Sequence, residues 1–347
     1  AFRLAALNMP AMQLVMYATI LCILWFGGWQ VQIGSVSQGQ IVALVNYMNQ
    51  ILLALVALAN LIVAVTRALA CAIRINEVFR VNSSMKEGAE EKNTQESGKP
   101  RVVFDHVTFT YGGAQEASLT DISFSAMPGE TVGIIGGTGS GKSTLVNLIP
   151  RFYDATKGSV TVDGQDVKAY TFRHLREKIG VVPQKAVLFL GTIRSNLQWR
   201  KKDAKESELW KALQIAQAEE VVKKKQKGLD EKVETGGRNF SGGQRQRLTI
   251  ARALVGEPEI LILDDSASAL DFATDAALRR SIKESTGNAT VFLVSQRAAT
   301  VKNADQILVL DDGKLVGKGT HEELLKNCNV YKEICMSQFS SQEVAQL

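Results

Sequence analysis

The prediction of the fold rests on one stretch, Gly136-Gly137-Thr138-Gly139-Ser140-Gly141-Lys142-Ser143-Thr144. It fits the pattern G-x-x-x-x-G-K-[ST] of a phosphate-binding P-loop. Residues 130–135 before it (ETVGII) predict a short buried strand, and residues 144–151 after it (TLVNLIPR) predict a helix. A strand, a glycine-rich loop and a helix in this order form the context that the motif requires. The sequence therefore predicts a site for a nucleoside triphosphate.

The residue types of this stretch suit phosphate chemistry. Glycines let successive backbone N–H groups turn inward around phosphate oxygens, and the N-terminus of the following helix adds its positive dipole end. The Lys142 ammonium is expected to reach the β- and γ-phosphates, and the Ser143 hydroxyl is expected to ligate Mg²⁺. ATP and Mg²⁺ are thus the predicted cofactors.

Length and charge exclude some classes of protein. The chain has 347 residues, which leaves room for roughly two domains. Its formal net charge is +5, and its basic residues do not gather on one motif, so no nucleic-acid partner is expected. The 4 cysteines lack metal-binding spacing and are expected to stay reduced.

Two uncharged stretches near the start, residues 11–29 and 41–65, are long enough to cross a bilayer, which takes about 20 apolar residues. The loop between them lacks Lys and Arg, while arginines lie beyond their outer ends, so both ends are predicted to be cytoplasmic. We expect the lipid bilayer of the cell membrane as a partner. A pair of buried core helices is the alternative, but this region offers no polar face. Amides such as Asn46 and Asn60 either line a substrate route or bond neighbouring helices.

The remaining chain divides by composition. The chain begins without Met inside an amphipathic pattern, so residues 1–80 are expected to end a longer membrane domain. Residues 81–100 are polar and predict a flexible linker. From residue 101 to 340, strands and helices alternate, with a helical insertion at about 192–227, which predicts an α/β domain with a mainly parallel sheet. Residues 341–347 are expected to form a tail.

Further motifs identify the chain as a member of a family. The segment Asn239-Phe240-Ser241-Gly242-Gly243-Gln244 resembles the signature loop of ABC transporters, and residues 260–265 (ILILDD) resemble their Walker B motif. Ser268-Ala269-Leu270-Asp271 is similar to their D-loop, Gln184 to their Q-loop residue and Tyr111 to their adenine-stacking residue. The resemblance covers residues 101 to about 339. The two apolar stretches resemble the last two of the six spans of an exporter half.

The resemblance implies a role for each motif. Asp264 would hold Mg²⁺ together with Ser143 and Gln184, and Tyr111 would stack on adenine. Two such domains pair head to tail in this family, so the Ser241 loop would close the nucleotide site of a second exporter half. The implied fold is a P-loop NTPase of the ABC type with a helical subdomain, preceded by transmembrane helices. The implied function is export of a small amphipathic compound.

Two positions depart from the family pattern. Asp265 stands where the family has a catalytic Glu, and Gln296 stands where it has the switch-loop His. With Gln184, these residues occupy the catalytic positions, and the two changes predict a site that binds ATP but hydrolyses it slowly. The signature loop is intact and should complete a working site on the partner. This asymmetry resembles the degenerate half of heterodimeric bacterial multidrug exporters of the BmrC/LmrC type.

The sequence leaves two other functions open. A homodimeric exporter of lipid or peptide would use two weak sites of the same kind. A soluble ABC ATPase of the repair or translation type would bind nucleic acid, and the two apolar stretches argue against it.

Overall fold

The computed structural model describes residues 2–81, 83, 85–91, 98–266 and 270–338, without the side chains of residues 2–9 and 272. The chain divides into two compact units, Ala1–Ser84 and Met85–Leu347. Ser268 and Ala269 of the predicted D-loop and the predicted tail, residues 341–347, lie outside the described residues.

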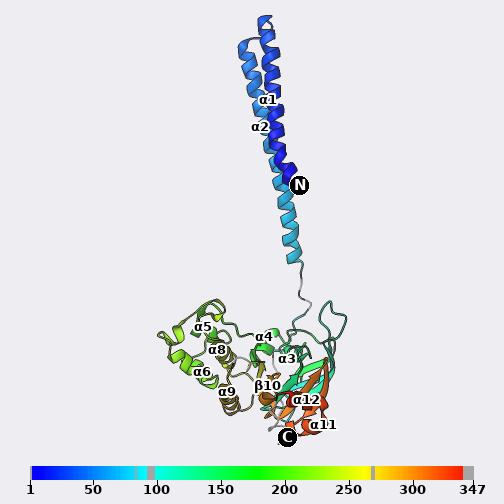
Figure 1. Cartoon of the computed structure of the whole chain (residues 1–347), viewed down its shortest axis with the longest axis vertical. Coiled ribbons are helices and arrows are strands. Elements are labelled where there is room, and N and C mark those ends of the chain that lie inside the picture. The colour runs from blue at the N-terminus through cyan, green and yellow to red at the C-terminus, as the bar shows by residue number, and fades with distance from the viewer. Residues whose placement is uncertain (1, 82, 84, 92–97, 267–269, 339–347) are drawn as a thin grey trace. The chain divides into compact units, whose positions relative to one another are not determined.

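The first unit consists of two long helices, α1 (Phe2–Gln32) and α2 (Gln38–Phe79), which lie side by side (Figure 1). Pro10–Gln32 and Gln38–Phe79 are both long and apolar enough to cross a membrane, with mean hydropathies of 1.7 and 2.3. Neither window buries a residue among those described, and Trp25 is 79% exposed. Apolar surface on this scale needs lipid or other helices to cover it. The two predicted spans lie inside these helices.

The second unit is built on a mainly parallel sheet, as the sequence predicted. Among the described residues the sheet has 6 strands in the order β12-β11-β3-β10-β9-β6. Only β12 runs antiparallel to its neighbour; the other pairs are parallel. The strands are β3 (Thr131–Gly136), β6 (Ile179–Val182), β9 (Ile260–Asp264), β10 (Thr290–Val294), β11 (Gln306–Asp311) and β12 (Lys314–Gly319). The central strands β3, β10 and β9 end at one edge, which is where such sheets bind ligands.

A second, antiparallel sheet with strand order β2-β1-β4-β5 covers the P-loop helix α3 (Lys142–Leu148). Phe104 and Phe124 stack in its core with ring centres 4.6 Å apart, and Phe124 reaches Phe292 of β10. The two sheets therefore share one hydrophobic core. The strands are β1 (Val102–Phe109), β2 (Leu119–Ala126), β4 (Lys157–Val162) and β5 (Gln165–Asp166).

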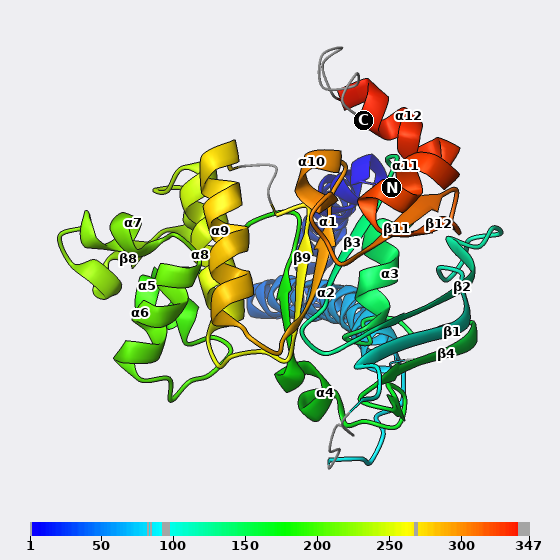
Figure 2. The same ribbon diagram turned by 90° about the horizontal axis from the view of Figure 1, so that it is seen from below.

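Helices form a subdomain at the opposite end of this unit from β1, β2 and β4 (Figure 2). Their apolar side chains share a core with the other face of the parallel sheet. The elements are β7 (Gly191–Thr192), α5 (Ile193–Leu197), α6 (Glu206–Ile215), α7 (Glu219–Lys223), β8 (Lys232–Val233), α8 (Gly242–Leu254) and α9 (Phe272–Ser285). Two short 3-10 turns, Gly228–Asp230 and Thr235–Gly237, lie before and after β8.

The C-terminal helices cover the parallel sheet beside β11. Tyr331 and Cys335 are fully buried in a cluster with Ile135 of β3, the strand that leads into the P-loop. The elements are α10 (Ala298–Val301), α11 (His321–Asn327) and α12 (Asn329–Gln338). The end of the chain thus supports the strand that carries the P-loop.

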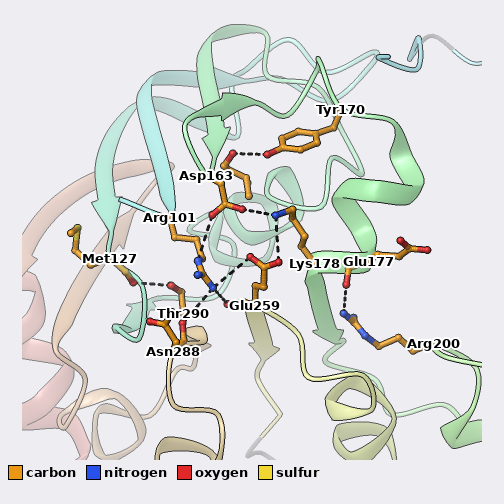
Figure 3. A network of polar contacts seen from close by, with 11 residues as sticks. Arg101, Met127, Asp163, Tyr170, Glu177, Lys178, Arg200, Glu259, Asn288 and Thr290 are labelled. Carbon is orange, nitrogen blue, oxygen red and sulfur yellow. Dashed lines mark hydrogen bonds and ion pairs between the residues drawn. The ribbon is translucent and has the colours of Figure 1, made fainter. Parts of the chain in front are cut away.

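A buried ionic network joins the two sheets (Figure 3). The Asp163 carboxylate is fully buried between Arg101, 3.5 Å away, and Lys178, 2.8 Å away. Lys178 ends α4 (Phe172–Lys178) and also contacts Glu259, which precedes β9, at 3.4 Å. Removing one partner from a buried ion pair leaves an uncompensated charge. The network therefore fixes the antiparallel sheet against the parallel one.

The polar stretch predicted to be a flexible linker differs in part from that prediction. Residues 85–91 pair with the backbone ahead of α4: the Gly88 N–H donates to the Tyr170 carbonyl at 3.1 Å, and the Glu90 N–H donates to the Ala169 carbonyl at 2.9 Å. A Cβ on Gly88 would lie 2.1 Å from the Ala169 carbonyl oxygen, so only glycine fits. Composition does not reveal this docking because backbone groups make it.

A buried arginine completes the attachment. Arg151 lies shortly after α3, is 3% exposed, and donates from Nη2 to the Lys86 carbonyl at 2.8 Å. Its Nε donates to Asp154 at 2.7 Å, and its Nη1 to the Lys168 carbonyl at 3.2 Å. Residues 85–91 are thus bonded through Arg151 to the chain just after the P-loop helix α3.

Candidate functional site

The P-loop adopts a conformation that requires glycine. Gly139 and Gly141 have φ angles of 84° and 92°, in the left-handed region that side chains rarely adopt. A Cβ on Gly141 would also lie 2.8 Å from the Ser118 carbonyl oxygen. The loop is therefore held tightly against the start of β2, and its backbone turns directly into α3.

Lys142 is buried inside this loop. Its Nζ donates to the carbonyl oxygens of Gly136 at 2.9 Å and Gly137 at 2.5 Å. The pKa of Lys142 is lowered, because the effect of burial outweighs the charges of Asp264 and Asp265, which raise it. The ammonium group thus lies among backbone oxygens that phosphate oxygens can replace.

The end of β9 approaches the start of α3. The Ser143 hydroxyl donates to Oδ1 of Asp264 at 3.1 Å. The pKa of Asp264 is raised, because the effect of burial outweighs the Ser143 hydrogen bond and the Lys142 charge, which lower it. A hydroxyl and a carboxylate are oxygen donors of the kind that Mg²⁺ prefers, with phosphate oxygens and water completing its shell. These side chains and Gln184 could hold Mg²⁺ here.

The three residues that the sequence predicts to be catalytic follow three neighbouring strands. Nε2 of Gln184, after β6, donates to Oδ2 of Asp265 at 3.3 Å. Asp265 directly follows β9, has a φ of 45°, and its N–H donates to the Val294 carbonyl at 2.9 Å. Gln296 follows β10 and lines the same cavity. The structure therefore brings the three residues to one edge of the parallel sheet.

Together these groups line a cavity of about 390 Å³, a size typical of small-molecule sites. Its walls include most of the residues that the sequence singled out: Tyr111, Thr138, Gly139, Gly141, Lys142, Ser143, Thr144, Gln184, Asp264, Asp265 and Gln296. They also include residues that were not among the predicted site residues: Ala117, Ser118, Val294, Ser295, Asp312 and Gly313. Gly136, Gly137 and Ser140 belong to the loop behind this wall and bond the Lys142 ammonium.

Tyr111 forms a rigid aromatic wall of the cavity. Its hydroxyl lies 3.1 Å from Oγ1 of Thr144. Its ring meets Phe109 and Tyr153 edge to face, at centre distances of 4.7 and 5.1 Å. Edge-to-face packing of this kind fixes an aromatic ring. A nucleobase entering the cavity would find the Tyr111 ring already in place.

The predicted signature loop lies outside the P-loop cavity. Ser241 caps α8: its Oγ accepts from the Gln244 N–H at 3.3 Å, and the Gln244 side chain accepts from the Ser241 N–H at 3.1 Å. Phe240 is buried below, and a Cβ on Gly242 would meet no atom within 4 Å. Within the described part of the chain, none of Asn239, Phe240, Ser241, Gly242, Gly243 and Gln244 lines the P-loop cavity.

Asp271 of the predicted D-loop is placed at the start of α9. Its Oδ1 accepts from the Thr274 N–H at 2.9 Å, and its Oδ2 accepts from the Thr274 hydroxyl at 2.8 Å. These bonds lower the pKa of Asp271. Asp271 is thus a helix cap here and is not part of the cavity wall.

Comparisons with known proteins agree with this site. The model of the family described as "ABC transporter" matches residues 119–268. The chain is 43% identical over 339 residues to the uncharacterized ABC transporter ATP-binding protein YfiB of Bacillus subtilis (strain 168), covering 98% of the chain and 58% of that protein.

Two further matches extend the likeness beyond the P-loop unit. The chain is 37% identical over 324 residues to YheI of the same bacterium, named a "probable multidrug resistance ABC transporter ATP-binding/permease protein", covering 93% of the chain and 55% of that protein. A solved bacterial Atm1-family ABC exporter with ATP bound matches with a TM-score of 0.78 and 30% identity, covering 97% of the chain and 59% of that structure. The chain thus spans less than two thirds of each of these proteins.

Proposed function

Since the chain belongs to the ABC transporter ATP-binding/permease family, we propose that it is one half of an exporter that uses Mg-ATP to drive efflux of small amphipathic compounds across the cell membrane. The observation that carries the proposal is the cavity built from Lys142, Ser143 and Asp264. It offers an ammonium group for phosphate oxygens and oxygen ligands for Mg²⁺.

A second nucleotide-binding domain is needed to complete this site. The Ser241 loop has the donors of a helix N-terminus, yet it lies outside the cavity of its own chain. Gly242 offers open space in front of that helix. A head-to-tail pair would place this loop over the partner's nucleotide and the partner's loop over Lys142.

The site in this chain is proposed to hydrolyse ATP slowly. An aspartate at position 265 is one methylene shorter than a glutamate, which withdraws the carboxylate by roughly an ångström, and a misplacement of that size costs about 100-fold in rate. Gln296 can donate a hydrogen bond to a phosphate, but it carries no charge and relays no proton. The intact Ser241 loop would complete a faster site on a different partner, which makes the complex a heterodimer.

The substrate class follows from the first unit and from a relative. Helices α1 and α2 expose apolar side chains along their length, which suits a bilayer and amphipathic compounds moving through it. The multidrug resistance name of YheI supports drugs or similar compounds as the exported class. By the distribution of arginines, the nucleotide-binding domain faces the cytoplasm.

Purification from the native membrane tests this proposal. The tagged protein should be recovered from the membrane fraction together with a different ABC half in a one-to-one complex, as mass spectrometry of the purified complex would show. A complex of identical copies would favour the homodimeric exporter of lipid or peptide. Recovery of the protein from the soluble fraction with nucleic acid would contradict an exporter.

A further inference from the structure

The side-chain amide of Gln338, in the last turn of α12, bridges the loop that follows β10. Its Nε2 donates to the Gln296 carbonyl oxygen at 2.7 Å, and its Oε1 accepts from the Ala298 N–H at 2.9 Å. One side chain thus holds two backbone groups on either side of Arg297. The two bonds are made together, so Gln338 fixes the path of the loop as well as its distance from α12.

The loop needs this support from outside. Ala298 begins the short helix α10, and the first N–H groups of a helix have no partner inside it. The residue at the cap position is Arg297, whose guanidinium has donors but no acceptor. Ser, Thr, Asp or Asn would normally accept such a bond. Gln338 supplies the missing acceptor from a different helix.

Packing of helix α12 against the domain fixes the position of Gln338. Tyr331 and Cys335, on the same helix, are fully buried in one cluster with Ala298 and Val301 of α10. Ile135 of β3 belongs to that cluster too, one residue before the P-loop begins. The position of Gln338 is therefore set by the packing that also supports the P-loop strand.

The other end of the loop is fixed to the same strand. The Ser295 N–H donates to the Ile134 carbonyl at 3.0 Å. Gln296 lies between this bond and the Gln338 amide, and it lines the nucleotide cavity. Its backbone is thus held on both sides, which limits the directions that its side chain can take.

We propose that Gln338 is a positioning residue of the nucleotide site, which holds the loop so that the Gln296 amide points at the terminal phosphate of ATP. The inference rests on the proposed binding of Mg-ATP in this cavity. ADP lacks the terminal phosphate, so the Gln338 contact affects ATP and leaves ADP unaffected. Gln338 makes the site prefer ATP without touching the nucleotide.

The test compares ATP and ADP affinities of the complete chain in its assembled complex, with Mg²⁺ present. Gln338→Leu keeps the size of the side chain and removes both hydrogen bonds. The Gln296 amide should then lose its proposed hydrogen bond to the terminal phosphate. Because one hydrogen bond contributes about 0.5–1.5 kcal/mol, ATP affinity should fall by about 2- to 10-fold. ADP affinity should stay unchanged, and the melting temperature should fall only modestly, because each of the two lost bonds contributes about 0.5–1.5 kcal/mol. Gln338→Asn, which is one methylene too short to bridge the loop, should show the same selective loss.

A matched control lies beside it on α12. Within the described part of the chain, the Ser337 hydroxyl bonds only inside its own helix, donating to the Ile334 carbonyl at 2.8 Å. Ser337→Ala should therefore leave both affinities unchanged. A double-mutant cycle gives the decisive reading: in a Gln296→Ala background, Gln338→Leu should have no further effect on the ratio of ATP to ADP affinity.

Other outcomes would overturn the inference. An unchanged ratio in both Gln338 variants, or an equal loss of ATP and ADP affinity, would show that Gln338 does not act through Gln296. Additive effects in the cycle would show the same. If the unaltered complex bound no ATP at the Lys142 loop, the proposed function would fail as well, whereas normal ATP binding with silent Gln338 variants would defeat this inference alone.

Discussion

The Gln184 amide donates a hydrogen bond to the Asp265 carboxylate, with 3.3 Å between Nε2 and Oδ2. The two residues follow β6 and β9, which are neighbours in the parallel sheet. The carboxylate at the position proposed to be catalytic is therefore one methylene shorter than a glutamate's and already accepts a hydrogen bond from a side chain. It lies beside Asp264, whose Oδ1 accepts from the Ser143 hydroxyl, so the residues proposed to bind Mg²⁺ and to activate water are adjacent.

Replacing the P-loop lysine should separate nucleotide binding from folding. Lys142→Ala removes the ammonium that would contact phosphate oxygens, and charge-assisted hydrogen bonds of this kind contribute about 1.5–3 kcal/mol each. ATP affinity should fall by about 10- to 100-fold, while the melting temperature falls only modestly, because the Gly136 and Gly137 carbonyls lose a donor. Equilibrium binding of labelled ATP measures the first and thermal unfolding the second. Unchanged affinity would remove Lys142 from the site.

A change in the signature loop should affect the partner's site alone. Gly242→Asp adds a negative charge in open space, where a Cβ meets no atom within 4 Å, and it leaves the Ser241 cap of α8 in place. ATP hydrolysis by the assembled complex should stop, with ATP binding to this chain retained. Ser241→Arg should act in the same way but also lose the cap, at about 1 kcal/mol. Persistent hydrolysis would show that this loop does not face the productive site.

The docked linker segment gives a prediction about local stability. In Gly88→Ala the new Cβ would collide with the Ala169 carbonyl, so residues 85–91 must leave their place beside α4. Tryptic cleavage after Lys86, whose carbonyl Arg151 holds, should become faster. Gly112→Ala is the control, because a Cβ there meets no atom within 4 Å. Equal cleavage rates in the two variants would contradict the docking.

Two histidines should give opposite responses to pH. Burial lowers the pKa of His321 from its usual 6.5, so its contribution to stability is complete above that value and is lost as the pH falls. The hydrogen bond to Asp121 raises the pKa of exposed His106, so its contribution is present at low pH and is lost as the pH rises through the raised value.

Melting temperatures between about pH 8 and about pH 5.5 test this contrast, since histidine titrates in that range. His321→Gln should reduce the loss of stability on acidification, because the depressed titration is removed. His106→Gln should increase that loss. Identical pH profiles of the two variants would show that the two side chains are not in these surroundings.

Local sequence signals were sufficient for the parallel sheet and for most of the cavity. The left-handed backbone at positions 139 and 141 favours glycine, and Asp264 ends an apolar strand. Both features could therefore be predicted from the sequence. Ser118 and Asp312 were not predicted, because they lie in loops directly before β2 and after β11, carry no motif, and reach the cavity only in the folded chain.

The same physical limit applies to two long-range contacts. The Gln338 bridge joins residues 42 positions apart, and the Arg151 contact with the Lys86 carbonyl spans 65 positions. Neither a polar linker nor the end of a short helix shows from composition which distant group it will meet. Such contacts arise from tertiary packing, which periodicity and motif spacing do not encode.

The steady-state ATPase rate of the proposed heterodimer, once purified, tests the proposed asymmetry most directly. Asp265→Asn in this chain should lower the rate by less than about tenfold, because no effective general base is removed. Replacing the acidic residue at the corresponding position of the partner by its amide should lower the rate to near background. Equal losses from the two replacements would mean two equivalent sites and would contradict a slowly hydrolysing site in this chain.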